Sequence, residues 1–271
     1  MSKTSGQKSK RLSIAAVALA LPMFAMAAST WSTSTCTGSS SVASVGNVET
    51  CSANGGVSVS MTAWSNTGSG GTFAASKLVE YSGGYGVLYA GESTTAPNHT
   101  MDNSGYLDSI LLNFSSAVVL SQFTLGWAAT DSDITLMRYD GATKKADGTS
   151  YTATDLISGK ASTTAGLTGW NLVNNYLDVA GSNPNPPSGG ISGNWQKDTG
   201  ADTSKGSSWW LISAYNKGVN GGSSPDALSD YVKLLAFAAT TPVNKTPEPA
   251  SLALALTALG GMYWMRRRRS A

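Results

Sequence analysis

Apolar and polar residues alternate through the middle of the chain, and this period of two is typical of extended strands. The alternation predicts strands over Tyr106–Phe114, Val118–Trp127 and Ile134–Tyr139. Ser115–Ser116 lies between the first two strands and is predicted to be a turn, as is Asp131–Asp133 before the third. Short strands separated by turn residues in this way are typical of a β-sandwich or a β-barrel.

The later part of the chain continues this pattern. Ser207–Asn216 and Ser229–Ala239 are predicted strands, and the glycine-rich residues 217–228 between them are a predicted loop. Val179–Asn194 is predicted to be a long loop because it is rich in Pro, Gly and Asn. The one helical alternative is Asp226–Ala236.

The composition agrees with an exported all-β protein. Charged residues make up 13% of the 271-residue chain, about half the share usual in soluble domains, and Ser, Thr, Asn and Gly replace them. The net charge of +2 comes from basic residues at the two ends, and the body between them carries more acidic than basic residues. We therefore predict no nucleic-acid binding. We predict one all-β domain over residues 29–240, a β-sandwich of jelly-roll-like form.

The N-terminus has the layout of a secretory signal peptide. Lys and Arg residues precede an apolar run over Leu12–Phe24, and the small-residue sequence Ala25-Met26-Ala27 follows it. The apolar run is short for a membrane span. We predict that residues 1–28 are a signal peptide, cleaved after Ala27 or Ala28, so that the protein is exported.

The C-terminus contains a second apolar segment. Residues 250–265 carry no charge and approach the length of about 20 residues that a membrane-spanning helix needs. The residues that follow, 266–271, begin with four arginines, Arg266, Arg267, Arg268 and Arg269, which would stay in the cytoplasm and leave the body outside. Residues 241–249 are then a short tether. A simple membrane anchor is one interpretation of this segment.

A more specific interpretation comes from the order of three features at this end. Pro247, Glu248 and Pro249 precede the apolar segment, and the arginine cluster closes the chain. This arrangement resembles the PEP-CTERM sorting signal of bacterial surface proteins. The resemblance implies an exosortase-type processing enzyme as a partner, transient anchoring in the inner membrane, and release to the outer surface or the extracellular matrix.

The body of the chain also resembles the exosortase-dependent surface proteins that carry such tails. The matching sequences are HTMDN (99–103), LGW (125–127) with the DSD and RYDG that follow it, and WWLISAYN (209–216). This second resemblance implies a surface or matrix protein and does not assign a biochemical activity.

Cys36 and Cys51 are the two cysteines of the chain. Cysteines in an exported protein usually pair, so we predict a disulfide between them. A metal site or a nucleophilic cysteine is the alternative, and both would need partner residues in a chain that has one histidine.

Asp131 and Asp133, with Asp102, Asp108 and Asp140 nearby in sequence, form the densest acidic group. Carboxylate oxygens suit Ca²⁺, so Asp131 and Asp133 are candidate calcium ligands, although Asp also favours turns without a metal. The spacing is not that of an EF-hand. Calcium is the one cofactor that the sequence suggests.

Two adjacent tryptophans, Trp209 and Trp210, are candidates for stacking on sugar rings. Residues that follow one another on a strand point to opposite faces, so one of the two rings is expected to face outward. Core packing is the alternative interpretation of both.

The residues that could support catalysis are few. His99 is the single histidine, and no G-x-S-x-G sequence is present. A glycosidase needs two carboxylates, and the sequence cannot show whether two of them face each other. We predict that the protein is not an enzyme.

The leading hypothesis is a structural or adhesive protein of biofilm or floc polysaccharide. A carbohydrate-binding module that uses calcium is the second hypothesis, and a secreted glycoside hydrolase is the third.

The sorting hypothesis predicts a specific defect. A chain that lacks residues 247–271 should be exported but should no longer reach the cell surface, because the processing enzyme has nothing to recognise. Fractionation of cells that express the full and the truncated chains measures this, and the mass of the mature C-terminus distinguishes a processed tail from a retained anchor. Unchanged surface delivery of the truncated chain would contradict the hypothesis.

Overall fold

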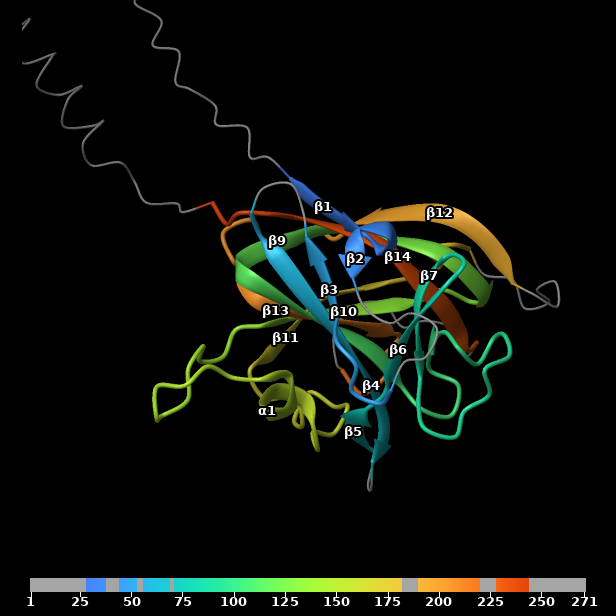
Figure 1. The fold of residues 1–271 in the computed structure, drawn as a ribbon, viewed down its shortest axis with the longest axis horizontal. Helices are drawn as coiled ribbons and strands as arrows, with labels where there is room; N and C mark the ends of the chain where they lie inside the picture. The colour runs from blue at the N-terminus through green and yellow to red at the C-terminus, as the bar shows by residue number, and fades with distance from the viewer. Residues whose placement is uncertain are drawn as a thin grey trace, which may run out of the picture.

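The computed structural model describes residues 28–37, 44–52, 56–68, 71–181, 190–219 and 228–243. The described residues form antiparallel β-sheet with one short α-helix, so the prediction of an all-β fold is confirmed (Figure 1). The strands are β1 (Ser29–Ser32), β2 (Cys36–Thr37), β3 (Glu49–Ser52), β4 (Ser58–Gly68), β5 (Thr72–Ala75), β6 (Lys77–Tyr81), β7 (Gly84–Leu88), β8 (Met101–Asp102), β9 (Asp108–Thr130), β10 (Ile134–Tyr139), β11 (Trp170–Tyr176), β12 (Ile191–Asp198), β13 (Ser207–Ala214) and β14 (Asp230–Thr240). The helix α1 spans Ala153–Ile157, and a 3-10 turn spans Thr33–Thr35.

Two sheets share the long strand β9. In the first, which we call sheet A, the second half of β9 lies between β12 and β14, and β14 in turn pairs with β1, β7 and β8. In the second, sheet B, the first half of β9 lies between β4 and β13, and the sheet continues through β10 to β11 on one side and through β3 to β2 on the other. All these strand pairs are antiparallel.

The predicted turn at Ser115–Ser116 is wrong, because β9 runs through it without reversing. The reason lies in its partners. Residues 108–114 pair with β4 and β13, whereas residues 119–130 pair with β14, so the two halves never pair with each other. Residues 115–117 are exposed at the point where the strand leaves one sheet for the other.

A large apolar cluster joins the two sheets. Ile110 and Leu112 in the first half of β9 belong to the same buried cluster as Phe123 and Leu125 in the second half. Trp210 of sheet B and Phe237 of sheet A also belong to it. The side chains of both sheets therefore meet in one core, in which the apolar area removed from water is the main stabilising contribution.

A second cluster covers the other face of sheet B. Trp209 and Leu211 of β13 pack there with Leu156 and Ile157 of α1 and with Trp170. In Figure 1, α1 and the loops next to it lie beside β11 and β13. Sheet B is thus buried on both faces, which explains why adjacent residues of β13 are both apolar.

Several sequence predictions have a definite outcome. Ile134–Tyr139 is a strand, the predicted strand at Ser207–Asn216 is present to Ala214, and Ser229–Ala239 corresponds to β14. Ile191–Asn194 belongs to strand β12 and not to the predicted loop. The helical alternative for Asp226–Ala236 is wrong for its described part, which leads into a strand.

The predicted disulfide is confirmed. Cys36 and Cys51 are bonded and lie opposite each other in the β2–β3 pair. Cys51 is fully buried and belongs to the main core, so the bridge fastens the N-terminal strands to it.

The predictions for the two ends concern residues outside the described part of the chain. These are the signal peptide, the sorting sequence at Pro247–Pro249, the apolar segment at 250–265 and the four arginines at 266–269. Within the described residues, no helix is long and apolar enough to cross a membrane.

Candidate functional site

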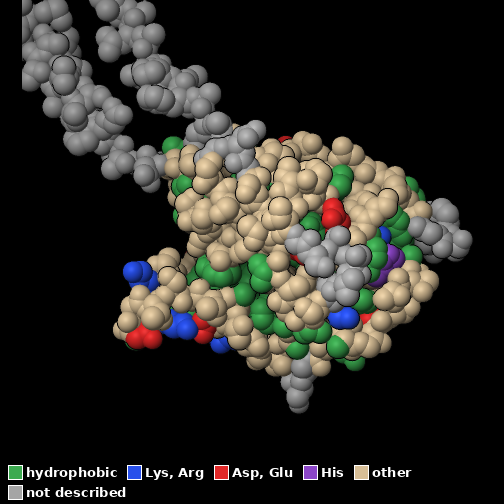
Figure 2. Space-filling model, in the orientation of Figure 1, with side chains coloured by type: hydrophobic (Ala, Val, Ile, Leu, Met, Phe, Trp, Pro, Cys, Tyr) green, Lys and Arg blue, Asp and Glu red, His purple; other side chains and the backbone are tan. Residues whose placement is uncertain are grey.

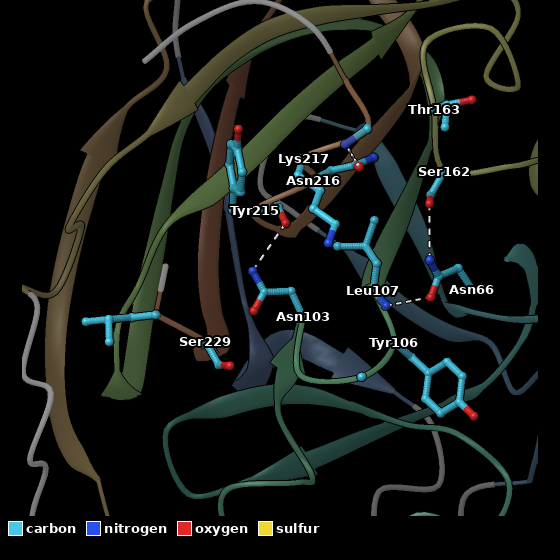
Figure 3. A pocket seen from close by; sticks show the side chains of 13 residues that line it. Asn66, Asn103, Tyr106, Leu107, Ser162, Thr163, Tyr215, Asn216, Lys217 and Ser229 are labelled. Carbon is cyan, nitrogen blue, oxygen red and sulfur yellow. Dashed lines mark hydrogen bonds between the residues drawn. The ribbon is translucent and has the colours of Figure 1, made fainter. Parts of the chain in front are cut away.

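A pocket of about 780 Å³ opens where β8 leads into β9 and where the chain leaves β13. Its walls are formed by Asn66, Asn103, Gly105–Leu107, Ser162, Thr163, Tyr215–Gly218, Leu228 and Ser229 (Figure 3). These residues offer amide and hydroxyl groups, tyrosine rings and one ammonium group. No Asp or Glu is among the described residues that line the pocket, so its lining has no pair of carboxylates such as a glycosidase requires.

Asn66 fixes one side of the pocket. Its Oδ1 accepts a hydrogen bond from the Leu107 amide at 2.6 Å, and its Nδ2 donates to Ser162 Oγ at 3.1 Å. The backbone amide of Asn66 also donates to the Leu107 carbonyl. Asn66 lies in β4 and therefore holds together the loop before β9 and the loop that contains Ser162 (Figure 3).

Asn103 fixes the other side through Asp230. The Asn103 Nδ2 atom donates to Asp230 Oδ2 at 2.5 Å and to the Tyr215 carbonyl at 3.3 Å, and the Asp230 amide donates to Asn103 Oδ1 at 2.9 Å. The Tyr215 amide also donates to Asp230 Oδ2. A buried carboxyl at the start of β14 thus holds two segments of the pocket wall.

Asp230 is also hydrogen-bonded to an acidic cluster, two members of which, Asp131 and Asp133, the sequence identified as candidate calcium ligands. Its Oδ1 accepts the amide of Asp133 at 2.6 Å. Carboxylate oxygens of Asp131, Asp133 and Asp178 lie within 4.8 Å of one another, and the first two residues are buried. The structure therefore brings Asp131 and Asp133 together, as a calcium site requires.

Asp178 is the member of this cluster that the sequence analysis missed. It follows β11, and the pairing of Ile134 with Tyr176 brings it beside Asp133, whose Oδ1 accepts the Asp178 amide at 2.7 Å. Nothing in the local sequence marks this contact, because the two residues are 45 positions apart. Asp178 has a φ of 48°, a left-handed conformation that Asp and Asn adopt more easily than most residues.

The other acidic residues that the sequence grouped with this pair are used elsewhere. Asp140 forms an ion pair with Arg138 and accepts a hydrogen bond from Asn171. Asp102 and Asp108 are both buried next to the pocket-forming loop 103–107. Asp102 Oδ1 accepts the Ser104 amide, and Asp108 accepts the hydroxyl of Ser65.

Burial makes these inner carboxyls weak acids. It raises the pKa of Asp230 to about 8, and the charges of Asp133 and Asp131 raise it as well. The pKa of Asp102 is also raised to about 8, mainly by burial and further by the charge of Glu92. Burial and the charge of Asp102 raise the pKa of Asp108 well above its usual value. Burial therefore favours the protonated form of each of these carboxyls.

The predicted glycan contact at Trp209 and Trp210 is wrong. Trp210 is fully buried and its Nε1 donates to the Ser207 carbonyl at 3.0 Å, and Trp209 is buried in the second cluster. The expectation that one ring faces solvent failed because sheet B is covered on both faces. The exposed aromatic residue of the pocket is Tyr106, which is 41% exposed and stacks edge-on against Tyr89.

His99 lies away from the pocket lining, in a buried group with Lys233. His99 Nε2 is 3.3 Å from Lys233 Nζ, which lies 4.7 Å from the ring centroids of both Tyr81 and Trp127. Burial and the charge of Lys233 lower the pKa of His99 to about 4, so the imidazole is neutral and can accept a hydrogen bond from the ammonium group. Burial lowers the pKa of Lys233 to about 8. This arrangement gives His99 a packing and hydrogen-bonding role.

The raised carboxyl pKa values predict that the protein is more stable in acid than at mildly alkaline pH. The pKa of Asp102 is about 8 in the folded state and about 3.9 in the unfolded chain, so its stabilising contribution is full below about pH 4 and is lost as the pH rises to about 8. The free energy of unfolding, measured with urea, should fall by at least about 2 kcal/mol between pH 5 and pH 8.

Asp102→Asn should reduce this fall, because the amide keeps the oxygen that accepts the Ser104 amide and cannot ionise. Asp198→Asn, on the exposed side of β12, is the matched control and should leave the pH dependence unchanged. An identical pH dependence in Asp102→Asn and the unaltered protein would contradict the assignment.

Comparisons with known proteins identified no relative of this chain. No protein-family model matches the chain, and searches of curated proteins and of solved structures found no match.

Proposed function

We propose that this chain is an exported surface or extracellular-matrix protein that binds polysaccharide in the pocket at the start of β9, as a structural or adhesive component of biofilm or floc. The observation that carries the proposal is the lining of that pocket. Amide groups, hydroxyl groups and tyrosine rings converge there on a rigid β-sheet framework, and these are the groups that bind sugar hydroxyls and stack on sugar rings.

The side chains of the pocket divide into two kinds. Asn66 and Asn103 are held by hydrogen bonds within the protein and shape the walls. Tyr106, Lys217 and Ser229 have no side-chain hydrogen bond to another described residue and are available to a ligand. A pocket with fixed walls and free polar groups binds without a large ordering cost.

The surface of the molecule supports the same proposal. In Figure 2 the backbone and side chains that are neither hydrophobic nor charged cover most of the visible face, and many of the charged side chains gather over the loop that leads to α1. A surface with few charges suits contact with polysaccharide through many weak hydrogen bonds. The proposed fold at the finer level is a jelly-roll-like β-sandwich.

Delivery to the surface is part of the proposal and rests on the sequence. The signal peptide would direct export, and Pro247, Glu248 and Pro249 with the apolar segment and Arg266–Arg269 would be handled by an exosortase-type enzyme at the inner membrane. The disulfide between Cys36 and Cys51 fits an oxidising compartment outside the cytoplasm.

The second part of the proposal is that Ca²⁺ binds to the acidic cluster and stabilises the pocket. Asp131, Asp133 and Asp178 would supply hard oxygen ligands to Ca²⁺, which would offset the repulsion among three neighbouring carboxylates. Asp230 connects this cluster to the pocket wall through hydrogen bonds to Asp133 and Asn103. Calcium would in this way stiffen the pocket without touching the sugar.

Binding to polysaccharide tests the main proposal. The purified body of the protein should bind one or more extracellular polysaccharides in affinity electrophoresis or calorimetry, and Tyr106→Ala should weaken binding roughly tenfold by removing an exposed ring. Tyr151→Ala, which removes a partly buried ring near α1 and outside the pocket, is the control and should keep full affinity. Failure to bind any polysaccharide, or equal loss in both variants, would contradict the proposal.

Calcium addition tests the second part of the proposal. Millimolar Ca²⁺ should raise the melting temperature of the unaltered protein, because a ligand that binds only the folded state stabilises it. Asp178→Asn should abolish this response and still fold, because Asp178 is exposed and Asn tolerates its left-handed backbone. Mg²⁺ at the same concentration controls for ionic strength. An equal response of both proteins to Ca²⁺ would exclude this cluster as the site.

A further inference from the structure

The charge of the pocket lining is carried by one side chain. Lys217 is exposed, and among the described residues that line the pocket it is the one that carries a formal charge. Figure 3 shows its side chain extending along the pocket between Tyr215 and Leu107. Two other lysines, Lys145 and Lys205, have carboxylate partners within 4.0 Å, whereas Lys217 has none among the described residues.

Two buried carboxyls, those of Asp230 and Asp102, lie outside the pocket lining. Asp230 lies behind Asn103 and Tyr215, and both of its oxygens accept hydrogen bonds from the protein. Burial raises the pKa of Asp102, next to the same wall, to about 8. Among the described residues that line the pocket, the Lys217 ammonium group therefore has no carboxylate beside it.

We infer that the pocket takes acidic polysaccharide, with the carboxylate of a uronate residue paired with the Lys217 ammonium group and the sugar hydroxyls bound by the free hydroxyl groups of Tyr106 and Ser229. This inference rests on the proposed function and names its ligand class. A neutral sugar would leave Lys217 without a charged partner among the described residues, whereas a uronate supplies both the charge and the hydroxyl groups that this lining matches. The tyrosine rings remain available for stacking on the sugar ring that carries the carboxylate.

The chemistry also predicts how binding depends on conditions. An ion pair that is open to solvent is screened by salt, so the preference for the acidic polymer should shrink as ionic strength rises. Hydrogen bonds and ring stacking to the same backbone are screened less, so binding of a neutral polymer should change little over the same range.

The test uses two polymers that share a backbone and differ at the carboxyl group, which is ionised in one and methyl-esterified in the other. Polygalacturonate and its fully methyl-esterified form have the same backbone, and calorimetry at low salt measures the affinity of the protein for each. The unaltered protein should prefer the acidic polymer by about fivefold, the upper range for an exposed ion pair. Lys217→Gln should abolish this preference, and Lys217→Arg should retain most of it.

Lys205→Gln is the matched control. It removes the same charge from an exposed lysine that lies outside the pocket, so it should leave the preference intact. Both positions are exposed, and circular dichroism should give the same melting temperature for the two glutamine variants.

The outcomes separate this inference from the proposed function. Equal affinity of the unaltered protein for both polymers would overturn the inference and leave polysaccharide binding intact. An equal loss of preference in Lys205→Gln and Lys217→Gln would also overturn it, because net charge and not the pocket would then decide. Absence of binding to every polysaccharide would overturn the proposed function itself.

Discussion

The backbone hydrogen bonding of β9 is the constraint on which the rest of the structure depends. This strand pairs on both edges along most of its length, with β4 and β13 in its first half and with β14 and β12 in its second. A single strand that belongs to two sheets sets their relative position. Its exposed residues 115–117 mark the change of sheet, and the apolar residues on either side of them contribute to one core.

The path of β9 also explains where the candidate site lies. The loop that contains Asn103 leads into the start of β9, and Asp230 pairs with Thr130 at its end. The hydrogen bonds between Asn103 and Asp230 show that these two ends of the strand come together. The pocket and the acidic cluster are therefore neighbours because one long strand, having changed sheets, returns to the same end of the molecule.

Asp230 connects the two halves of this region through its carboxyl group. It accepts hydrogen bonds from Asn103, Tyr215 and Asp133, so that the pocket wall and the cluster share one buried group. A buried carboxyl is costly when it is charged and unpaired, and these donors together with a raised pKa reduce that cost. Occupancy of the acidic cluster by a cation would change the charge around Asp230 and, through it, the walls that position the proposed polysaccharide.

The sequence by itself determined the fold class, the disulfide and most strands after residue 100, because alternation and turn residues are local properties of the chain. It also placed Asp131 and Asp133 on one tight turn. Only the tertiary structure decided that β9 is continuous at Ser115, that Trp209 and Trp210 are both buried, that Asp178 joins the acidic cluster, and that Asp230 is hydrogen-bonded to it. These features depend on which strands pair and on what covers each sheet, and such contacts join residues far apart in sequence that no local pattern can relate.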